Sequence, residues 1–123
     1  MKALFYIFIG GGAGSILRYV ISKYLNDVHH SFPVGTFVVN TLGSFLIGIL
    51  LGIAMKQKLL TGPFSWFLIV GFCGGFTTFS TFAYENHYLL KDGNLFHFAV
   101  YTIASVVTAL IFVFLGAWLV KYI

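Results

Sequence analysis

Residues 71–82 read GFCGGFTTFSTF, so small, hydroxyl-bearing and aromatic side chains alternate here within an apolar stretch. The glycines weaken a helix, and the β-branched residues Thr77 and Thr78 weaken it further. In a membrane, a broken helix exposes backbone carbonyls that bind small cations and half-helix N-termini that attract anions. We therefore expect a helix that is broken near residues 74–78 and lined by groups able to bind an ion.

The phenylalanines of this stretch allow two interpretations. Phe76, Phe79 and Phe82 follow at i, i+3 and i+6, which places their rings along nearly one side of a helix. Ser80 and Thr81 fill the neighbouring faces. Because an aromatic ring has a positive edge, rings presented edge-on could stabilise a small anion. In a chain with 15 phenylalanines, the same rings could equally pack in an apolar core.

Polar residues elsewhere also recur at helical spacing. Asn40 belongs to a stripe in which polar or small residues follow one another at intervals of four: Thr36, Asn40, Ser44, Gly48 and Gly52. Similar stripes comprise Gly11, Ser15, Arg18 and Ser22 near the start and Tyr101, Ser105 and Thr108 near the end. The Asn40 carboxamide could donate N–H groups to an anion or form an interhelical hydrogen bond. We expect the glycines to serve close helix packing.

The composition predicts the elements that must position these groups. Of 123 residues, 59% are hydrophobic and only 8% are charged, whereas a soluble domain carries about 25% charged residues. Each of four apolar segments exceeds the roughly 20 residues that a helix needs to cross a bilayer; they span about 3–24, 34–55, 64–84 and 96–120. We therefore predict an all-α integral membrane protein with a single domain over 1–123 and both termini on one side.

The acidic residues restrict the transport classes. We expect Asp27 and Asp92 in loops and Glu85 at the end of the third helix, so none would lie deep in the membrane. A proton-coupled exporter needs a titratable group in its substrate path, and cation channels favour acidic rings. The remaining hydroxyl, amide, arginine and backbone groups suit an anion better than a cation.

The lone cysteine and the histidines suggest no metal site. We interpret Cys73 as a small buried hydrophobic residue. The histidines lack metal-ligand spacing to another strong ligand; they are His29, His30, His87 and His97.

The basic residues are almost evenly divided between the two membrane sides. One side would hold Lys2, Lys56, Lys58 and Lys121, and the other Arg18, Lys23 and Lys91. Four charges against three orient a membrane protein weakly, so the chain could insert in both orientations and form an antiparallel dimer. A single orientation remains the alternative. The charges form no basic run, so we expect no nucleic-acid partner.

Three motifs together resemble a known family. GGGAGSILRY in the first helix, GTFVVNTLGSFLIG in the second and GFCGGFTTFSTF in the third closely resemble the Fluc/CrcB family of fluoride channels, in the family's order and over nearly the whole chain. The resemblance implies an antiparallel, dual-topology homodimer with two fluoride pores in the bacterial inner membrane. It also implies passive export of fluoride from the cytoplasm.

The resemblance further implies roles for individual residues. Those that match the fluoride pore are Asn40, Phe79, Phe82, Ser80, Thr81, Tyr101, Ser105 and Arg18. The backbone carbonyls of Gly74 and Thr77 match the ligands of a structural Na⁺ on the dimer's two-fold axis. Ala109 stands where a further hydroxyl is expected, and Thr108 or Thr102 could replace it. Glu85 matches an acidic position of unassigned role.

Two other classes of membrane protein deserve comparison. A proton-coupled exporter of the small multidrug-resistance type also has four short helices, but the first helix here has no glutamate to exchange protons for a drug. A holin-like pore former would explain the hydrophobicity but not the specific broken third helix. The exporter is the main alternative to a fluoride channel.

Overall fold

The computed structural model describes residues 1–26, 31–57 and 61–123. Asp27, His29, His30 and Lys58, which the sequence analysis mentions, lie outside these residues. The elements follow in the order α1 (Lys2–Leu25), α2 (Val34–Gln57), η1 (Ser65–Cys73), α3 (Gly74–Phe76), α4 (Ser80–Lys91), α5 (Leu95–Leu119) and η2 (Val120–Tyr122). Of these, η1 is a π-helix and η2 a 3₁₀ turn.

The described residues form helices and their connections, as predicted, and four stretches are long and apolar enough to cross a membrane. They are Lys2–Leu25, Val34–Lys56, Ser65–Lys91 and Leu95–Tyr122. Many large apolar side chains on these helices face outward, for example Phe8, Ile103 and Phe114. Such a surface is typical of helices that contact lipid or a partner.

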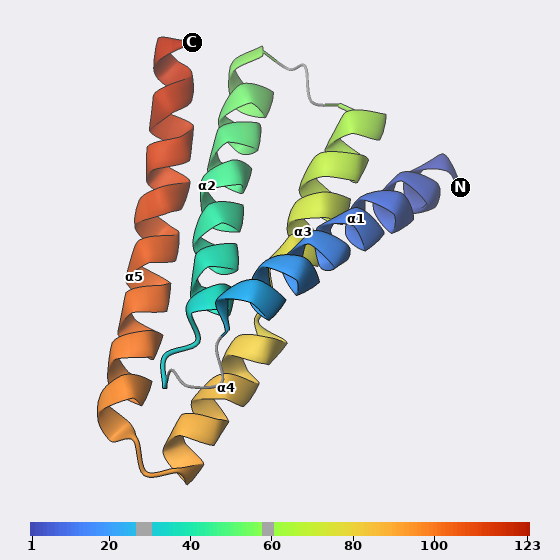
Figure 1. Cartoon of the computed structure of the whole chain (residues 1–123). Helices are drawn as coiled ribbons and strands as arrows, with labels where there is room; N and C mark the ends of the chain where they lie inside the picture. The colour runs from blue at the N-terminus through green and yellow to red at the C-terminus, as the bar shows by residue number, and fades with distance from the viewer. Residues whose placement is uncertain (27–30, 58–60) are drawn as a thin grey trace.

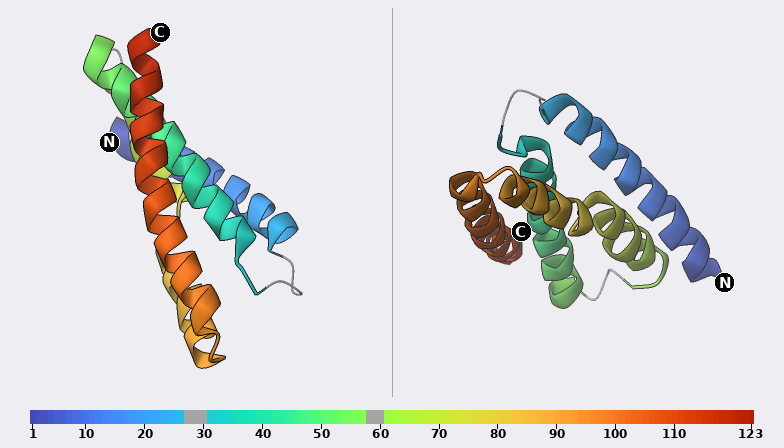
Figure 2. Two further views of the ribbon diagram at one scale, coloured as in Figure 1. Left: turned by 90° about the vertical axis from the view of Figure 1, so that its left-hand side faces the viewer. Right: turned by 90° about the horizontal axis from the view of Figure 1, so that it is seen from below.

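The helices pack in two pairs. α2 lies along α5, and α1 lies against η1 and α3 (Figure 1). α1 and α5 occupy opposite sides of α2, which Figure 2 shows from two further directions. Both termini lie toward the upper end in Figure 1, away from the turn between α4 and α5, in agreement with four crossings.

Glycines permit the close approach in both pairs. A Cβ atom at Gly14 of α1 would collide with the backbone of Phe72, and one at Gly48 of α2 would collide with the backbone of Val113. From the other side, a Cβ at Gly116 would meet the Phe45 backbone. The expectation that Gly48 serves helix packing is therefore confirmed, and Gly14 and Gly116 make similar close approaches.

The third span differs from the expectation in where it breaks. Gly74 and Gly75 remain helical, and the helix ends after Phe76, with the break at Thr77–Phe79. Gly75 lies against α1, where its backbone approaches that of Gly11, whereas Gly74 faces open space. At Gly75, packing thus overrides the low helix propensity of glycine.

The second half of this span is longer than expected. α4 continues to Lys91, whereas the apolar stretch of the sequence predicts an end near residue 84. Its buried residues Asn86 and Leu89 pack inward, and the helix closes at Gly93, which has a φ of 71°. The N–H of Gly93 donates to the Leu90 carbonyl and the N–H of Asn94 to the Leu89 carbonyl, which is a Schellman cap. Glu85 therefore lies within α4 rather than at a helix end.

Candidate functional site

The break in the third span is stabilised by its own threonine. Both the N–H and the Oγ1 hydroxyl of Thr77 donate to the Cys73 carbonyl, at 3.1 and 2.9 Å. Thr77 then turns to an extended conformation, with ψ of 158°. A hydroxyl that bonds the backbone in this way offers an alternative to continued helix, so the chain leaves the helix at this residue.

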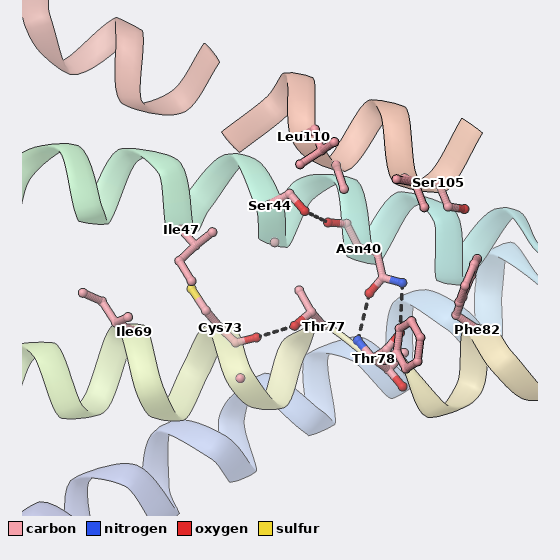
Figure 3. Close-up of a pocket in the computed structure, with 15 residues that line it drawn as sticks. Asn40, Ser44, Ile47, Ile69, Cys73, Thr77, Thr78, Phe82, Ser105 and Leu110 are labelled. Carbon is pink, nitrogen blue, oxygen red and sulfur yellow. Dashed lines mark hydrogen bonds between the residues drawn. The ribbon is translucent and has the colours of Figure 1, made fainter. Parts of the chain in front are cut away.

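Asn40 of α2 binds the unwound backbone directly. Its Oδ1 accepts the Thr78 N–H at 2.8 Å, and its Nδ2 donates to the Thr78 carbonyl at 3.0 Å (Figure 3). Both backbone groups lost from the helix at Thr78 are thereby satisfied. The interhelical hydrogen bond that the sequence left open for Asn40 is therefore present. A carboxamide has a second N–H, which these two bonds do not use.

The start of α4 is capped by Thr78, whose role the sequence analysis did not identify. Its Oγ1 accepts the Thr81 N–H at 3.2 Å and donates to the Thr81 hydroxyl at 3.1 Å. The Ser80 hydroxyl lies 3.5 Å from the same atom. Ser80 and Thr81, both predicted pore residues, thus belong to the cap rather than to the lining of the adjacent groove. The Thr-x-x-Thr spacing is the signal that could have revealed it.

An open groove of about 470 Å³ runs beside the break, between α2, the third span and α5. Figure 3 shows its lining side chains converging from these three walls. Its polar lining residues are Asn40, Ser44, Thr77, Thr78 and Ser105, and its larger apolar ones are Ile47, Ile69, Phe79, Phe82, Val106 and Leu110. The structure therefore brings together Asn40, Phe79, Phe82 and Ser105 of the predicted pore set.

The phenylalanines divide into a core group and a groove group. Phe76 is buried and stacks on Phe72 at a centroid distance of 5.6 Å. Phe79 is 80% exposed, and its ring lies 5.7 Å from that of Phe82, which in turn lies 5.1 Å from Tyr101. The expectation that Phe76 shares a side with the other two is wrong, because the break separates them. Phe79 and Phe82 remain side by side in the groove.

The α5 wall carries one hydroxyl without a protein partner. Ser105 Oγ is buried and forms no hydrogen bond within the described residues. The two threonines considered as substitutes for Ala109 are engaged elsewhere. Thr108 donates to the Ala104 carbonyl at 2.6 Å and Thr102 to Asn86 Oδ1 at 2.9 Å. Neither lines the groove, whereas Ala109 does.

Glu85 accepts two hydrogen bonds behind the groove. Thr36 Oγ1 donates to its Oε1 at 2.6 Å, and the Tyr101 hydroxyl donates to its Oε2 at 2.7 Å. Thr36 and Tyr101 are fully buried. Tyr101, a predicted pore residue, therefore faces Glu85 instead of the groove lining. No local sequence pattern indicates this network, because its three residues lie on three different helices.

Arg18 is the remaining predicted pore residue, and it lies on the opposite face of the third span. Its Nε donates to the Gly75 carbonyl at 3.0 Å, and Ser15 Oγ donates to the same oxygen at 3.4 Å. Arg18 is not among the residues that line the groove. This hydrogen bond supplies a donor to one of the carbonyls that the end of α3 leaves without a helical N–H.

The chemistry of the groove suits a small anion. Its lining residues include Asn40, which has an amide N–H to spare, Ser105, whose hydroxyl has no partner within the described residues, and two phenylalanines, whose ring edges carry positive character. None of the described lining residues is acidic, so the ring of carboxylates typical of cation channels is not formed by this part of the chain. Glu85, although half-buried, is separated from the lining.

Comparison with known proteins identifies related chains. A family model described as CrcB-like protein, Camphor Resistance (CrcB), matches residues 5–117. A fluoride-specific ion channel FluC of Azobacteroides pseudotrichonymphae is 42% identical over 123 residues, which cover 99% of this chain and 98% of the relative. The protein of the same name from Leptospira interrogans is 44% identical, with 98% and 95% covered. That of Phocaeicola vulgatus is 46% identical, with 97% and 98% covered.

Proposed function

Because the chain belongs to the CrcB family, in which these relatives are fluoride-specific ion channels, we propose that it conducts fluoride selectively and passively across a membrane. It is a member of a family of channels and not an enzyme. Its four apolar helices supply the spans. Since the relatives are bacterial, the membrane in question is the bacterial inner membrane, and the direction of flow is export from the cytoplasm.

One observation carries the proposal: the break brings Asn40, Ser105 and the Phe79–Phe82 pair to one groove at membrane depth. Moving an unpaired ion from water into an apolar medium costs on the order of tens of kcal/mol. Fluoride can enter only if other groups replace its water. The spare Asn40 N–H, the Ser105 hydroxyl and the ring edges are the groups offered.

Selectivity follows from the same donors. A fixed set of short-range N–H, O–H and ring-edge contacts stabilises a small anion most, because Coulombic attraction rises as the distance falls. Chloride is larger, so it would be rejected by its size and because these donors would stay farther from its centre. No titratable group takes part in this step, so transport needs no proton coupling and follows the electrochemical gradient.

The complete channel is an antiparallel homodimer with two pores. The groove is open along one side in the single chain, and Phe79 is 80% exposed beside it. A second copy would cover this side. The near balance of basic residues across the membrane supports insertion of the chain in both orientations.

A structural Na⁺ fits the end of α3. Carbonyl oxygens are suitable ligands for hard cations, and helix ends leave carbonyls without donors. Within the described residues, hydrogen bonds at the break engage the carbonyls of Cys73, Gly75 and Thr78. The proposed ligands, the Gly74 and Thr77 carbonyls, are not among these three. Gly74 also faces open space. One chain would supply two ligands and its partner two more.

The proton-coupled exporter remains the alternative to exclude by experiment. Contrary to expectation, Glu85 lies within a spanning helix and is half-buried. However, it is paired with Thr36 and Tyr101 and does not line the groove. An exporter would need this carboxylate in contact with its substrate.

Efflux from liposomes tests the proposal. Wild-type protein should release fluoride rapidly and retain chloride. Phe79→Ile removes the ring edge and should reduce fluoride release by roughly tenfold or more, the loss of one strong contact to the permeating ion. Phe96→Ile is the matched control, because Phe96 is similarly exposed, at 74%, but lies away from the groove. Equal release of both anions, or none of fluoride from folded protein, would refute the proposal.

A further inference from the structure

The groove supplies donors unevenly along its length. At one level, Asn40 on α2 and Ser105 on α5 provide an amide and a hydroxyl. One turn farther, toward Ile47, the walls contributed by α5 and η1 are apolar, with Ala109, Leu110 and Ile69. An anion that moves past Asn40 in this direction therefore meets only apolar side chains at Ala109, Leu110 and Ile69 on two of the three walls.

Ser44 lies at this poorer level. Val113 packs against Gly48, and α2 and α5 run in the same direction, so Ser44, one turn before Gly48, lies across from Ala109, one turn before Val113. Both residues line the groove. Figure 3 shows Ser44 on α2, between Asn40 and Ile47.

We propose that Ser44 is a pore residue whose hydroxyl receives fluoride from the Asn40 level and replaces the donor that Ala109 lacks. This inference rests on the proposed function and adds a specific residue to the conduction path. It does not follow from the family motifs, which assign no role to Ser44.

The hydroxyl can change partners at low cost. Ser44 Oγ donates to the Asn40 backbone carbonyl at 2.7 Å. In a regular helix the same carbonyl also accepts the Ser44 backbone N–H, so rotation of the side chain leaves no carbonyl unpaired. Hydrogen bonds to an ion are roughly twice as strong as those between neutral groups. An anion at this level therefore competes successfully for the hydroxyl.

Thr108 shows why location in the groove is essential. Its hydroxyl makes the same type of bond, to the carbonyl of Ala104 four residues earlier, at 2.6 Å. Unlike Ser44, Thr108 does not line the groove. If a hydroxyl bonded to the carbonyl four residues earlier served only to stabilise its own helix, removing the Ser44 or the Thr108 hydroxyl would change fluoride conduction to a similar extent.

Fluoride efflux from liposomes, at equal amounts of protein that elutes as the wild-type species in gel filtration, tests the inference. Ser44→Ala should reduce the rate by about tenfold, as expected for one lost charge-assisted hydrogen bond. Ser44→Thr, which keeps a hydroxyl, should remain close to the wild-type rate. Adding Ala109→Ser to Ser44→Ala should restore conduction, because the hydroxyl then comes from the opposite wall. Thr108→Val is the control and should be unchanged.

The outcomes separate the inference from the proposed function. If the wild type releases no fluoride, the proposed function fails. If the wild type conducts and Ser44→Ala conducts equally well, the role of Ser44 is refuted. A loss in Ser44→Ala that Ala109→Ser does not restore would also overturn it, since the hydroxyl would then matter for the structure of α2 and not for the ion.

Discussion

At the scale of single residues, Asn40 combines two functions that the sequence presented as alternatives. Its carboxamide satisfies the N–H and the carbonyl of Thr78, which fixes the shape of the break. The second N–H of the same amide is available to an ion in the groove. An amide is the only neutral side chain that can accept from and donate to one peptide unit while retaining a further donor.

Asn40→Asp should remove the hydrogen-bond donors of this side chain and keep an acceptor. The carboxylate can still accept the Thr78 N–H but can neither donate to the Thr78 carbonyl nor attract an anion. Fluoride efflux should fall by more than about tenfold, and the unpaired carbonyl should lower the unfolding free energy by about 1–3 kcal/mol. Efflux and thermal unfolding in detergent measure the two effects.

Asn94→Asp is the matched control for this change. Asn94 caps α5 through its Oδ1, which accepts the His97 N–H at 3.4 Å, and aspartate caps a helix about as well as asparagine. Fluoride efflux and the free energy of unfolding should therefore remain near the wild-type values. Conduction by Asn40→Asp at the rate of Asn94→Asp would contradict the role assigned to Asn40.

At the scale of elements, the break depends on tertiary contacts as well as local sequence. The four apolar helices could be predicted from composition and length, since neither depends on partners. The start of the break could not, because Gly75 packs against Gly11 of α1 and the helix continues to Phe76. Thr78 leaves the helix where Asn40, 38 positions earlier in the chain, binds it. No local pattern reveals such a contact.

The same reasoning explains which site residues the sequence identified. Asn40, Phe79, Phe82 and Ser105 could be selected by type and motif, and the structure places them around one groove. Tyr101 and Arg18 were also selected by resemblance, but their contacts are with Glu85 and the Gly75 carbonyl. Spacing places a residue on a helix face without specifying which neighbour that face meets.

Gly14→Ala should disrupt the packing of α1 against the third span. The added Cβ would collide with the Phe72 carbonyl and lie 2.8 Å from the Phe76 backbone nitrogen. Backbone cannot rotate away, so the two elements must separate, and we expect a loss of about 1–3 kcal/mol together with reduced efflux. Thermal unfolding of the purified protein provides the measurement.

Gly12→Ala is a control on the same helix. A Cβ at Gly12 meets nothing within 4 Å, and alanine favours the helix by about 1 kcal/mol over glycine. This variant should be at least as stable as the wild type. If both alanine variants were equally stable, the close approach at Gly14 would not support the fold as described.

At the scale of the whole molecule, a single chain leaves its candidate pore incomplete. The groove is open, and Phe79 beside it is exposed. The charges flanking the spans differ by one, four against three, and this small bias favours neither orientation strongly. A pair of oppositely oriented copies would account for both properties.

Labelling of single cysteines tests the orientation. Tyr122→Cys and Asp92→Cys, each combined with Cys73→Ser, place an exposed thiol at opposite ends of the molecule. In dual topology, a membrane-impermeant maleimide added to spheroplasts should label about half of the protein in each variant. Full labelling of one variant and none of the other would show a single orientation.

The reversal potential of the wild-type protein shows whether the chain conducts fluoride selectively and passively. Purified protein in a planar bilayer would face a fluoride gradient in one direction, a chloride gradient in the other and equal pH. Selective passive conduction predicts a current that reverses near the fluoride equilibrium potential and does not shift when a pH gradient is imposed. Reversal that follows chloride would contradict selectivity, and reversal that follows the pH gradient would favour the proton-coupled exporter.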